Sequence, residues 1–147
     1  MKKLGLLVAS AIVLFCSLSC EKVDVIGNIE EQDGLWAPMK MNKTELSFPK
    51  NGGQMTVTCN NYSYWWIAGA WEGEGGDDAY IFPKSSDPLM KISDYLDGEW
   101  LHAVVPRTGK VNTVIITIYP NTSSQPRKGS ITMECGDAFG YISINQQ

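Results

Sequence analysis

Apolar and polar residues alternate along three consecutive runs in the last third of this sequence. The apolar face of each run consists of Val114, Ile116 and Ile118, then Ile131, Met133 and Cys135, then Ile142 and Ile144. A period of two is typical of a β-strand with one buried face. Turn-forming residues at 120–126 and 136–140 separate the runs. The pattern therefore predicts three strands joined by short hairpins.

Two further strands are predicted earlier in the chain. Residues 45–48 lead through a Pro- and Gly-containing turn at 49–53 into residues 54–59. In this second run Met55, Val57 and Cys59 share one face. Alternation bounded by turn residues again indicates strands.

The next strand is predicted over residues 64–70 and carries two adjacent tryptophans. Neighbouring residues in a strand point to opposite faces, so Trp65 and Trp66 should diverge. Ile67 lies two residues after Trp65 and indicates that Trp65 is the buried one. Trp66 then shares the outer face with Tyr64.

A family resemblance rests on residues scattered over these strands and turns. They are Trp100-Leu101, Val105-Pro106, Gly109, Asn121, Arg127, Gly129-Ser130-Ile131 and Ile142-Ser143-Ile144-Asn145-Gln146. This stretch resembles the BACON family, immunoglobulin-like β-sandwich modules of Bacteroidetes proteins, over roughly residues 44–147. The resemblance implies an all-β fold, an antiparallel sandwich of about seven strands. It also implies a non-catalytic module, often proposed to bind carbohydrate and sometimes only a spacer.

The chain departs from the family pattern at residues 71–99, where the family passes within a few residues to the strand beginning at Trp100. Residues 79–82 are typical of a short edge strand. Residues 86–88, Ser-Asp-Pro, predict the N-cap and first turn of a short helix that ends at Asp97-Gly98. One face of this helix would carry Leu89, Ile92 and Leu96. We expect the insertion to be one loop whose helix packs on the sandwich.

The N-terminal residues predict export and lipidation. Two lysines precede an apolar run from Leu4 to Phe15, which is too short to span a bilayer and is typical of a secretory signal. Ser17-Leu18-Ser19-Cys20 resembles a bacterial lipoprotein cleavage box. We predict a signal peptide at 1–19, a lipidated tether from Cys20 to residue 43 with Trp36 docking on the domain, and one domain at 44–147. The alternative is an ordinary cleaved signal with Cys20 incidental.

Charge narrows the class of partner. Without Lys2 and Lys3 the chain has 10 basic and 16 acidic residues, a net charge of −6, which would repel nucleic acid. The whole of this net charge lies in the insertion at 71–99, and the rest of the mature chain is balanced. A solvated acidic loop of this kind disfavours anionic glycans and favours neutral glycans or a basic protein partner.

Exposed aromatic residues are the candidate binding site. Rings on a sheet surface stack well on the apolar faces of pyranose rings. The predicted carbohydrate-binding residues are Tyr64, Trp66, Trp71, Tyr80 and Tyr95. The alternative is that the insertion's helix covers Trp66 and forms a second small core.

Other chemistry has weaker support in the sequence. Asp77, Asp78, Asp94, Asp97 and Glu99 form only a loose constellation without the order of a calcium loop, so we predict no metal and no cofactor. The single histidine, His102, should lie on an outer face and has poor partners for a triad or a zinc site. We therefore predict no enzyme activity.

Cys59 and Cys135 both end strands on the core side, and the immunoglobulin-like order places these strands in opposite sheets. In an exported protein we predict a disulfide between them. Two buried thiols acting as small apolar residues are the alternative.

Two functions follow from these observations. The first is a lipid-anchored carbohydrate-binding module of the bacterial outer membrane, at the cell surface in preference to the periplasmic face. The second is an adaptor lipoprotein whose acidic insertion docks another envelope protein. In an up-and-down sandwich the turn at 49–53, the insertion and the loop at 121–127 share the end opposite the tether, so we expect the insertion to point away from the membrane.

Overall fold

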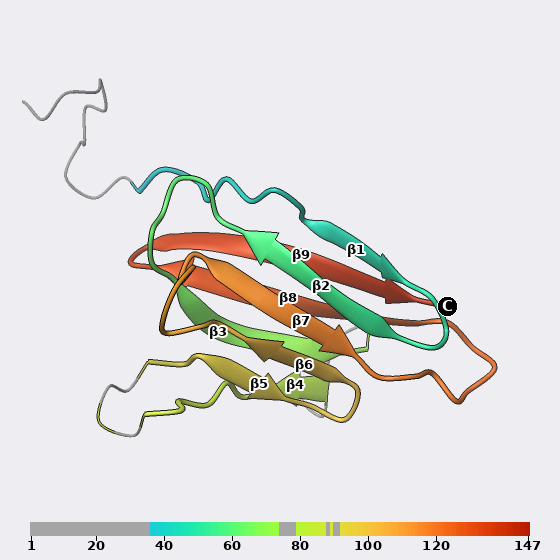
Figure 1. Cartoon of the computed structure of the whole chain (residues 1–147). Coiled ribbons are helices and arrows are strands. Elements are labelled where there is room, and N and C mark those ends of the chain that lie inside the picture. The colour runs from blue at the N-terminus through green and yellow to red at the C-terminus, as the bar shows by residue number, and fades with distance from the viewer. Residues whose placement is uncertain (1–35, 74–78, 88, 90–91) are drawn as a thin grey trace, which may run out of the picture. The chain divides into compact units, whose positions relative to one another are not determined.

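Nine strands form two sheets in the described part of the chain, residues 36–73, 79–87, 89 and 92–147 of a computed structural model. The strands are β1 (Glu45–Phe48), β2 (Gly53–Thr58), β3 (Trp66–Glu72), β4 (Tyr80–Ile81), β5 (Tyr95–Asp97), β6 (Leu101–Val104), β7 (Thr113–Ile118), β8 (Arg127–Cys135) and β9 (Ala138–Gln146). One sheet has the order β1-β9-β8-β3-β4 and the other β2-β7-β6-β5. They lie as two layers (Figure 1), which confirms the predicted all-β sandwich. Within the described residues, no helix has the length and apolar character needed to cross a bilayer.

The strand pairing agrees with the prediction at one edge and differs from it in two other respects. β4 confirms the short edge strand predicted at 79–82, whereas β5, at the edge of the other sheet, was not predicted. The first strand, β1, pairs with β9 in parallel, whereas the other pairs are antiparallel. The centre of the larger sheet is the β8–β9 hairpin, whose nine-residue strands pair along their full length.

The core lies between the sheets and is filled by the predicted faces of the strands. Trp65 is fully buried, and its indole Nε1–H donates to the carbonyl oxygen of Thr113 on β7 at 3.3 Å. Ile67 is also fully buried, whereas Trp66 is half-buried on the other side of β3. The prediction that the two tryptophans point to opposite faces is confirmed. Other core side chains are Val57, Val114, Ile116, Ile118, Ile131, Met133, Ile142 and Ile144.

Several residues that carry the family resemblance stabilise one end of the sandwich. The Arg127 guanidinium lies 4.5 Å from the ring of Trp100, donates from Nε to Gln146 Oε1 at 2.7 Å, and donates from Nη2 to the carbonyl oxygen of Tyr119 at 2.7 Å. Asn121 is buried and donates to the carbonyl oxygens of Gln125 and Gln147. These residues therefore serve the fold rather than a binding surface.

The segment at 36–43 packs on the domain at the opposite end. Trp36 lies 6.2 Å from the ring of Tyr62 and touches Gly136, and it thus contacts the domain as expected. Gly136 has a φ of +57°, and a Cβ there would meet the Trp36 ring at 2.5 Å. Met39 and Met41 pack against the core. The described part of the predicted tether is therefore in contact with the sandwich.

The predicted helix at 86–97 is not present among the described residues of the insertion. Asp87 accepts the backbone N–H of Leu89 through its side chain, which forms a turn rather than a helix N-cap. Leu89 is exposed, whereas Leu96 is buried in strand β5, so the two do not share a helical face. Asp97 pairs with His102, which makes Asp97-Gly98 part of a tight β5–β6 connection instead of a helix end.

The insertion does not lie wholly at the end opposite the tether. Glu72 at the end of β3 pairs with Gly129 at that far end, near the turn after Phe48. The chain then runs back through β4, and the backbone N–H of Ile67 donates to the carbonyl oxygen of Ser93 near the tether end. The expectation that the insertion as a whole points away from the tether is therefore wrong, because this segment pairs along the edge of both sheets.

Candidate functional site

The outer face of the five-stranded sheet carries aromatic side chains on both sides of strand β8. Alternation along β8 directs Lys128, Ser130, Thr132 and Glu134 to this face, which we call the β8 trough. On the β9 side, Tyr141 pairs with Thr132 and Phe139 pairs with Glu134. On the β3 side, Trp66 pairs with Glu134 and Trp71 pairs with Ser130. Short polar side chains thus form the middle of a strip with larger rings on either side.

A β-bulge places Trp71 on this face. Ile67 pairs with Met133, and the next residue of β8, Thr132, pairs with Gly69 rather than with Ala68. Ala68 is therefore an extra residue in β3. The bulge reverses the alternation, and Trp71 emerges on the same side as Trp66.

The glycine in the bulge makes room for a second ring. A Cβ on Gly69 would overlap the Tyr80 ring, and the Tyr80 hydroxyl donates to the carbonyl oxygen of Ala68 at 3.1 Å. Tyr80 also packs edge-on against Trp71, with ring centroids 4.8 Å apart. Phe82 lies 4.7 Å from Tyr80 and is exposed. Trp71, Tyr80 and Phe82 therefore form a continuous aromatic wall.

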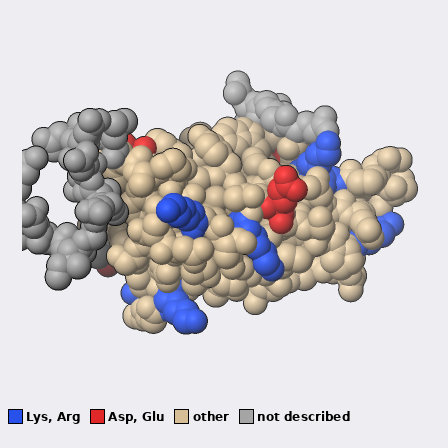
Figure 2. Space-filling view, turned by 90° about the horizontal axis from the view of Figure 1, so that it is seen from above, with Lys and Arg blue, Asp and Glu red and all other residues tan. Residues whose placement is uncertain are grey.

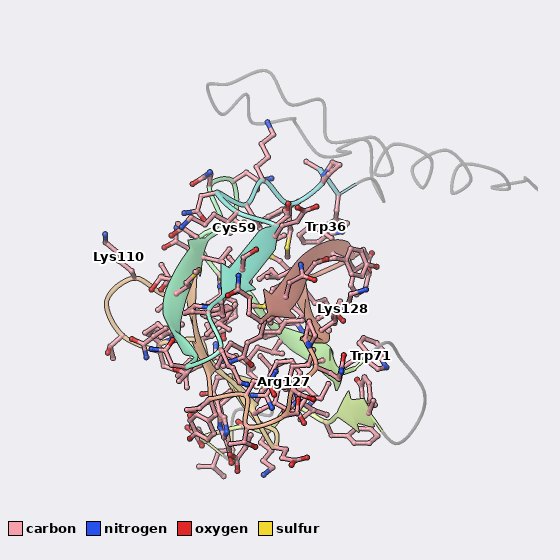
Figure 3. All side chains as sticks on the ribbon, turned by 90° about the vertical axis from the view of Figure 1, so that its right-hand side faces the viewer. Trp36, Cys59, Trp71, Lys110, Arg127 and Lys128 are labelled. Atoms are coloured by element: carbon pink, nitrogen blue, oxygen red, sulfur yellow. The ribbon has the colours of Figure 1, made fainter. Side chains whose placement is uncertain are left out.

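An open groove of about 820 Å³ lies at the Trp71 end of the trough. Its lining includes Trp71, Lys128, Ser130, Ser143, Asn145 and Glu45. Figure 3 shows Trp71 and Lys128 on the same side of the sheet, away from Cys59. The groove thus combines one large ring with hydroxyl, amide and charged groups, which can bind a polar ligand that has an apolar face.

Three of the five predicted aromatic residues lie on this face, Tyr64 lies next to one of them, and Tyr95 lies on the other sheet. Trp66, Trp71 and Tyr80 lie on it. The Tyr64 ring is 6.4 Å from Trp66, but its hydroxyl accepts a hydrogen bond from Arg107 at 3.1 Å. Tyr95 is on β5 in the other sheet, beneath the ammonium of Lys84. The predicted set is therefore not one patch.

Three further aromatic residues were not predicted from the sequence and are among the most exposed of the described chain: Phe82, Phe139 and Tyr141. Tyr141 is 65% exposed and lies directly across β8 from the Gly69 bulge. The signal in the sequence that could have identified Phe139 and Tyr141 is the alternation along β9, in which Ala138, Gly140 and Ile142 face inward. Residues 136–140 were interpreted as a turn, but the turn between β8 and β9 consists only of Gly136 and Asp137.

Four of the five described acidic residues of the insertion, Glu72, Asp87, Asp94 and Asp97, bind other groups of the domain through their carboxylates. The Glu72 carboxylate accepts the backbone N–H groups of Glu99, Trp100 and Leu101 at 2.6–3.0 Å. Asp97 contacts Lys84 at 3.5 Å and His102 Nδ1 at 3.1 Å. Such pairing leaves fewer carboxylates for a docking partner. Among the described residues there is no group of three or more His, Cys, Asp or Glu side chains able to hold a metal ion, while Asp77 and Asp78 lie outside those residues.

Asp94 is the most deeply buried of these carboxylates, with 4% exposure. It accepts hydrogen bonds from the backbone N–H and the hydroxyl of Ser86 and from Arg107 Nε at 3.1 Å. Burial by itself raises the pKa of Asp94, but the bonds from Ser86 and the charge of Arg107 outweigh it, so the pKa is lowered. The ionised carboxylate therefore fastens the insertion to the residues after β6.

This network predicts a loss of stability in acid. An unfolded aspartate titrates at about 3.9, and the folded pKa of Asp94 is lower. The stabilisation should be complete above about pH 5 and should decrease as the pH falls through the folded pKa. Urea unfolding between neutral and acidic pH should show this slope, and Asp94→Asn should reduce it. Equal slopes in the two proteins would contradict the assignment.

The predicted disulfide is not formed in the structure, where Cys59 and Cys135 are free thiols. Cys59 is fully buried, with its Sγ 3.4 Å from Asn61 Oδ1. Burial and the neighbouring Cys59 raise the pKa of Cys135, which keeps that thiol protonated. Cys59 thus acts as a small apolar side chain of the core, as in the alternative considered above, and the partly buried Cys135 packs against that core. Cys20 lies outside the described residues.

Comparisons with known proteins agree with this architecture. Residues 86–147 match the model of the BACON family, described as "Putative binding domain, N-terminal". The predicted resemblance is thereby confirmed for this part of the chain. A solved structure described as "NMR structure of the protein from Bacteroides thetaiotaomicron" is 24% identical, with a TM-score of 0.61, and the match covers 82% of this chain and 95% of that chain. At this identity the likeness shows the fold alone. A search of the curated proteins found no match.

Proposed function

We propose that this chain, with its BACON-like domain, is a lipid-anchored, non-catalytic module of the bacterial cell envelope that binds neutral carbohydrate on the outer face of its five-stranded sheet. One observation carries the proposal. Aromatic side chains line both sides of the β8 trough, whose centre is the hydroxyl-bearing pair Ser130 and Thr132. The family description, a binding domain, is consistent with this assignment.

The chemistry of the trough matches the two kinds of surface on a sugar. A pyranose ring has apolar C–H faces that stack on aromatic rings, and Trp71 and Tyr141 offer such rings. Its hydroxyl groups donate and accept hydrogen bonds, as the side chains of Ser130, Thr132 and Ser143 do. A strand-based platform holds these groups with little freedom, which lowers the entropic cost of binding.

Charge supports a neutral ligand. Lys128 and Glu134 bring one charge of each sign to the trough, and Glu45 adds another acid at the groove. In the view of Figure 2 the basic and acidic side chains are scattered over the described surface and do not gather into one patch. An anionic glycan or a nucleic acid would need a concentrated positive field.

The lipid anchor at Cys20 and the outer-membrane location remain part of the proposal, supported by the lipoprotein-like leader. Multiple acyl chains on one residue give stable membrane attachment. Labelling of growing cells with a tagged fatty acid should mark the protein. If Cys20→Ser is labelled equally, the acyl chain is on another residue, and if neither protein is labelled, there is no acyl anchor.

We expect Trp71→Ala to weaken carbohydrate binding at least about tenfold, since one stacked ring contributes on the order of 1.4 kcal/mol. Affinity electrophoresis in gels containing starch, xylan, mannan, β-glucan or arabinogalactan measures this directly. Tyr119→Ala is the matched control, because Tyr119 is 47% exposed and follows β7 of the other sheet. The proposal is wrong if no neutral polysaccharide retards the wild-type protein, or if the two variants behave alike.

A further inference from the structure

We infer that the β8 trough binds a stretch of several consecutive sugars of a linear glycan, lying along β8, rather than a single sugar or a chain end. This inference rests on the proposed function and specifies its ligand. It follows from the spacing of the aromatic residues, the composition of the trough floor and the open form of the groove.

The aromatic residues are spread along β8 instead of gathering around one point. Trp66 is level with Glu134, and Trp71 is level with Ser130, four residues further along. At about 3.3 Å per residue this separation is roughly 13 Å along the strand, more than one sugar ring can cover. On the other side of β8, Tyr141 is level with Thr132, between those two positions. A ligand that uses all three rings must therefore be an oligomer.

The floor of the trough is continuous and uncharged between these rings. Ser130 and Thr132 occupy consecutive outward positions of β8, and the charged residues Lys128 and Glu134 lie beyond them at either end. Side chains with hydroxyl groups repeat along the strand about every 7 Å, so successive sugars meet similar partners. Hydrogen-bonding side chains that repeat along the strand can bind the successive units of a ligand that is itself a repeating chain of sugars.

The groove at the Trp71 end is broad and open to solvent. A site for a chain end or a monosaccharide encloses its ligand in a pocket that buries most of its surface. Here the ligand would lie on a sheet face, with one side in contact with the protein. Adequate contact area on such a surface requires several sugar units, and the affinity should therefore depend on ligand length.

The inference is tested with oligosaccharides of two to six units from the glucose, xylose and mannose series, by isothermal titration to the full domain. In the series that binds, affinity should rise at least about tenfold from the disaccharide to the longest member. Equal affinity of the disaccharide and the hexasaccharide would overturn the inference while leaving the proposed function intact. Failure of every polysaccharide and oligosaccharide to bind would overturn both.

Two variants test the contribution of each end of the trough to binding. In Trp66→Ala and in Trp71→Ala, affinity should no longer rise with the length of the ligand. In at least one of the two variants, the affinity for the disaccharide should stay within about threefold of the wild-type value. Tyr119→Ala should keep the full dependence on length. If both end variants retain the wild-type dependence on length, the ligand does not extend along β8 and the inference is wrong.

Discussion

Replacing Trp65 by alanine should lower the free energy of unfolding by about 3 to 5 kcal/mol, the usual cost of removing a large aromatic side chain from a core. Trp65 is fully buried between the sheets. The substitution leaves a cavity and removes the donor to the Thr113 carbonyl oxygen. Chemical denaturation followed by circular dichroism gives the difference. If Trp65→Ala is too unstable to purify, Trp65→Phe should show a smaller loss, because it keeps part of the ring volume.

The neighbouring Trp66 is the matched control for this prediction. It is half-buried on the outer face and contacts the Tyr64 ring. Trp66→Ala should cost about 1 kcal/mol, as expected for a partly exposed site. Comparable losses in the two variants would mean that both indoles contribute to the core. That result would remove Trp66 from the proposed binding face.

The strands and their buried faces could be predicted from the sequence because alternation is a local property. In β7, Val114, Ile116 and Ile118 are buried as predicted, and the same holds for Ile142 and Ile144 in β9. These runs keep a strict period of two over their length, so no knowledge of the partner strand was needed. The sandwich follows, since each strand must bury one face.

The position of Trp71 could not be predicted by alternation. Counting in twos from the buried Ile67 would place Trp71 in the core, but the extra residue at Ala68 reverses the faces. A bulge depends on the pairing of β3 with β8, and on Tyr80 filling the space above Gly69. Such contacts join residues far apart in the sequence, and no local pattern reports them.

The prediction of a helix at 86–97 was wrong because two local signals, at Asp87 and at Asp97-Gly98, also occur in turns and hairpins. Asp87 makes a side-chain turn as readily as an N-cap, since both use the same acceptor for a backbone N–H two residues on. Asp97-Gly98 is also a strong hairpin signal when apolar residues flank it. Pairing of Leu96 with Ala103 on β6 buries that leucine in the core and decides in favour of the strand.

The aromatic residues of β9 were missed for a related reason. Phe139 and Tyr141 follow Gly136 and Asp137, and a segment with glycines at 136 and 140 has the composition of a loop. Only two residues form the turn, however, and Gly140 lies inside β9, where Met39 and Met41 pack against it. A Cβ at this position would meet the ends of the Met39 and Met41 side chains, so the glycine suits the docking of the N-terminal segment, which the sequence alone does not place.

Arg127→Ala should lower the free energy of unfolding by about 2 to 4 kcal/mol, because it removes the stacking on Trp100 and leaves the buried Oε1 of Gln146 without its donor. Gln146 is 2% exposed, and its Oε1 accepts from Arg127 while its Nε2 donates to the carbonyl oxygens of Pro49, Lys50 and Tyr119. The amide oxygen of Gln146 therefore depends on Arg127 as its donor, and the amide nitrogen ties the turn after β1 to the end of β7. Thermal and urea unfolding measure the loss.

The shape of the guanidinium, and not only its charge, explains the expected size of this effect. Arg127 stacks on Trp100 while two of its nitrogens donate in different directions, which a lysine ammonium cannot reproduce. Arg127→Lys should therefore recover less than half of the loss. Lys110→Ala, in the exposed loop between β6 and β7, should change stability by less than about 0.5 kcal/mol. Full recovery by lysine would show that a positive charge near Glu72 and Glu99 is sufficient, and that the network through Gln146 contributes little.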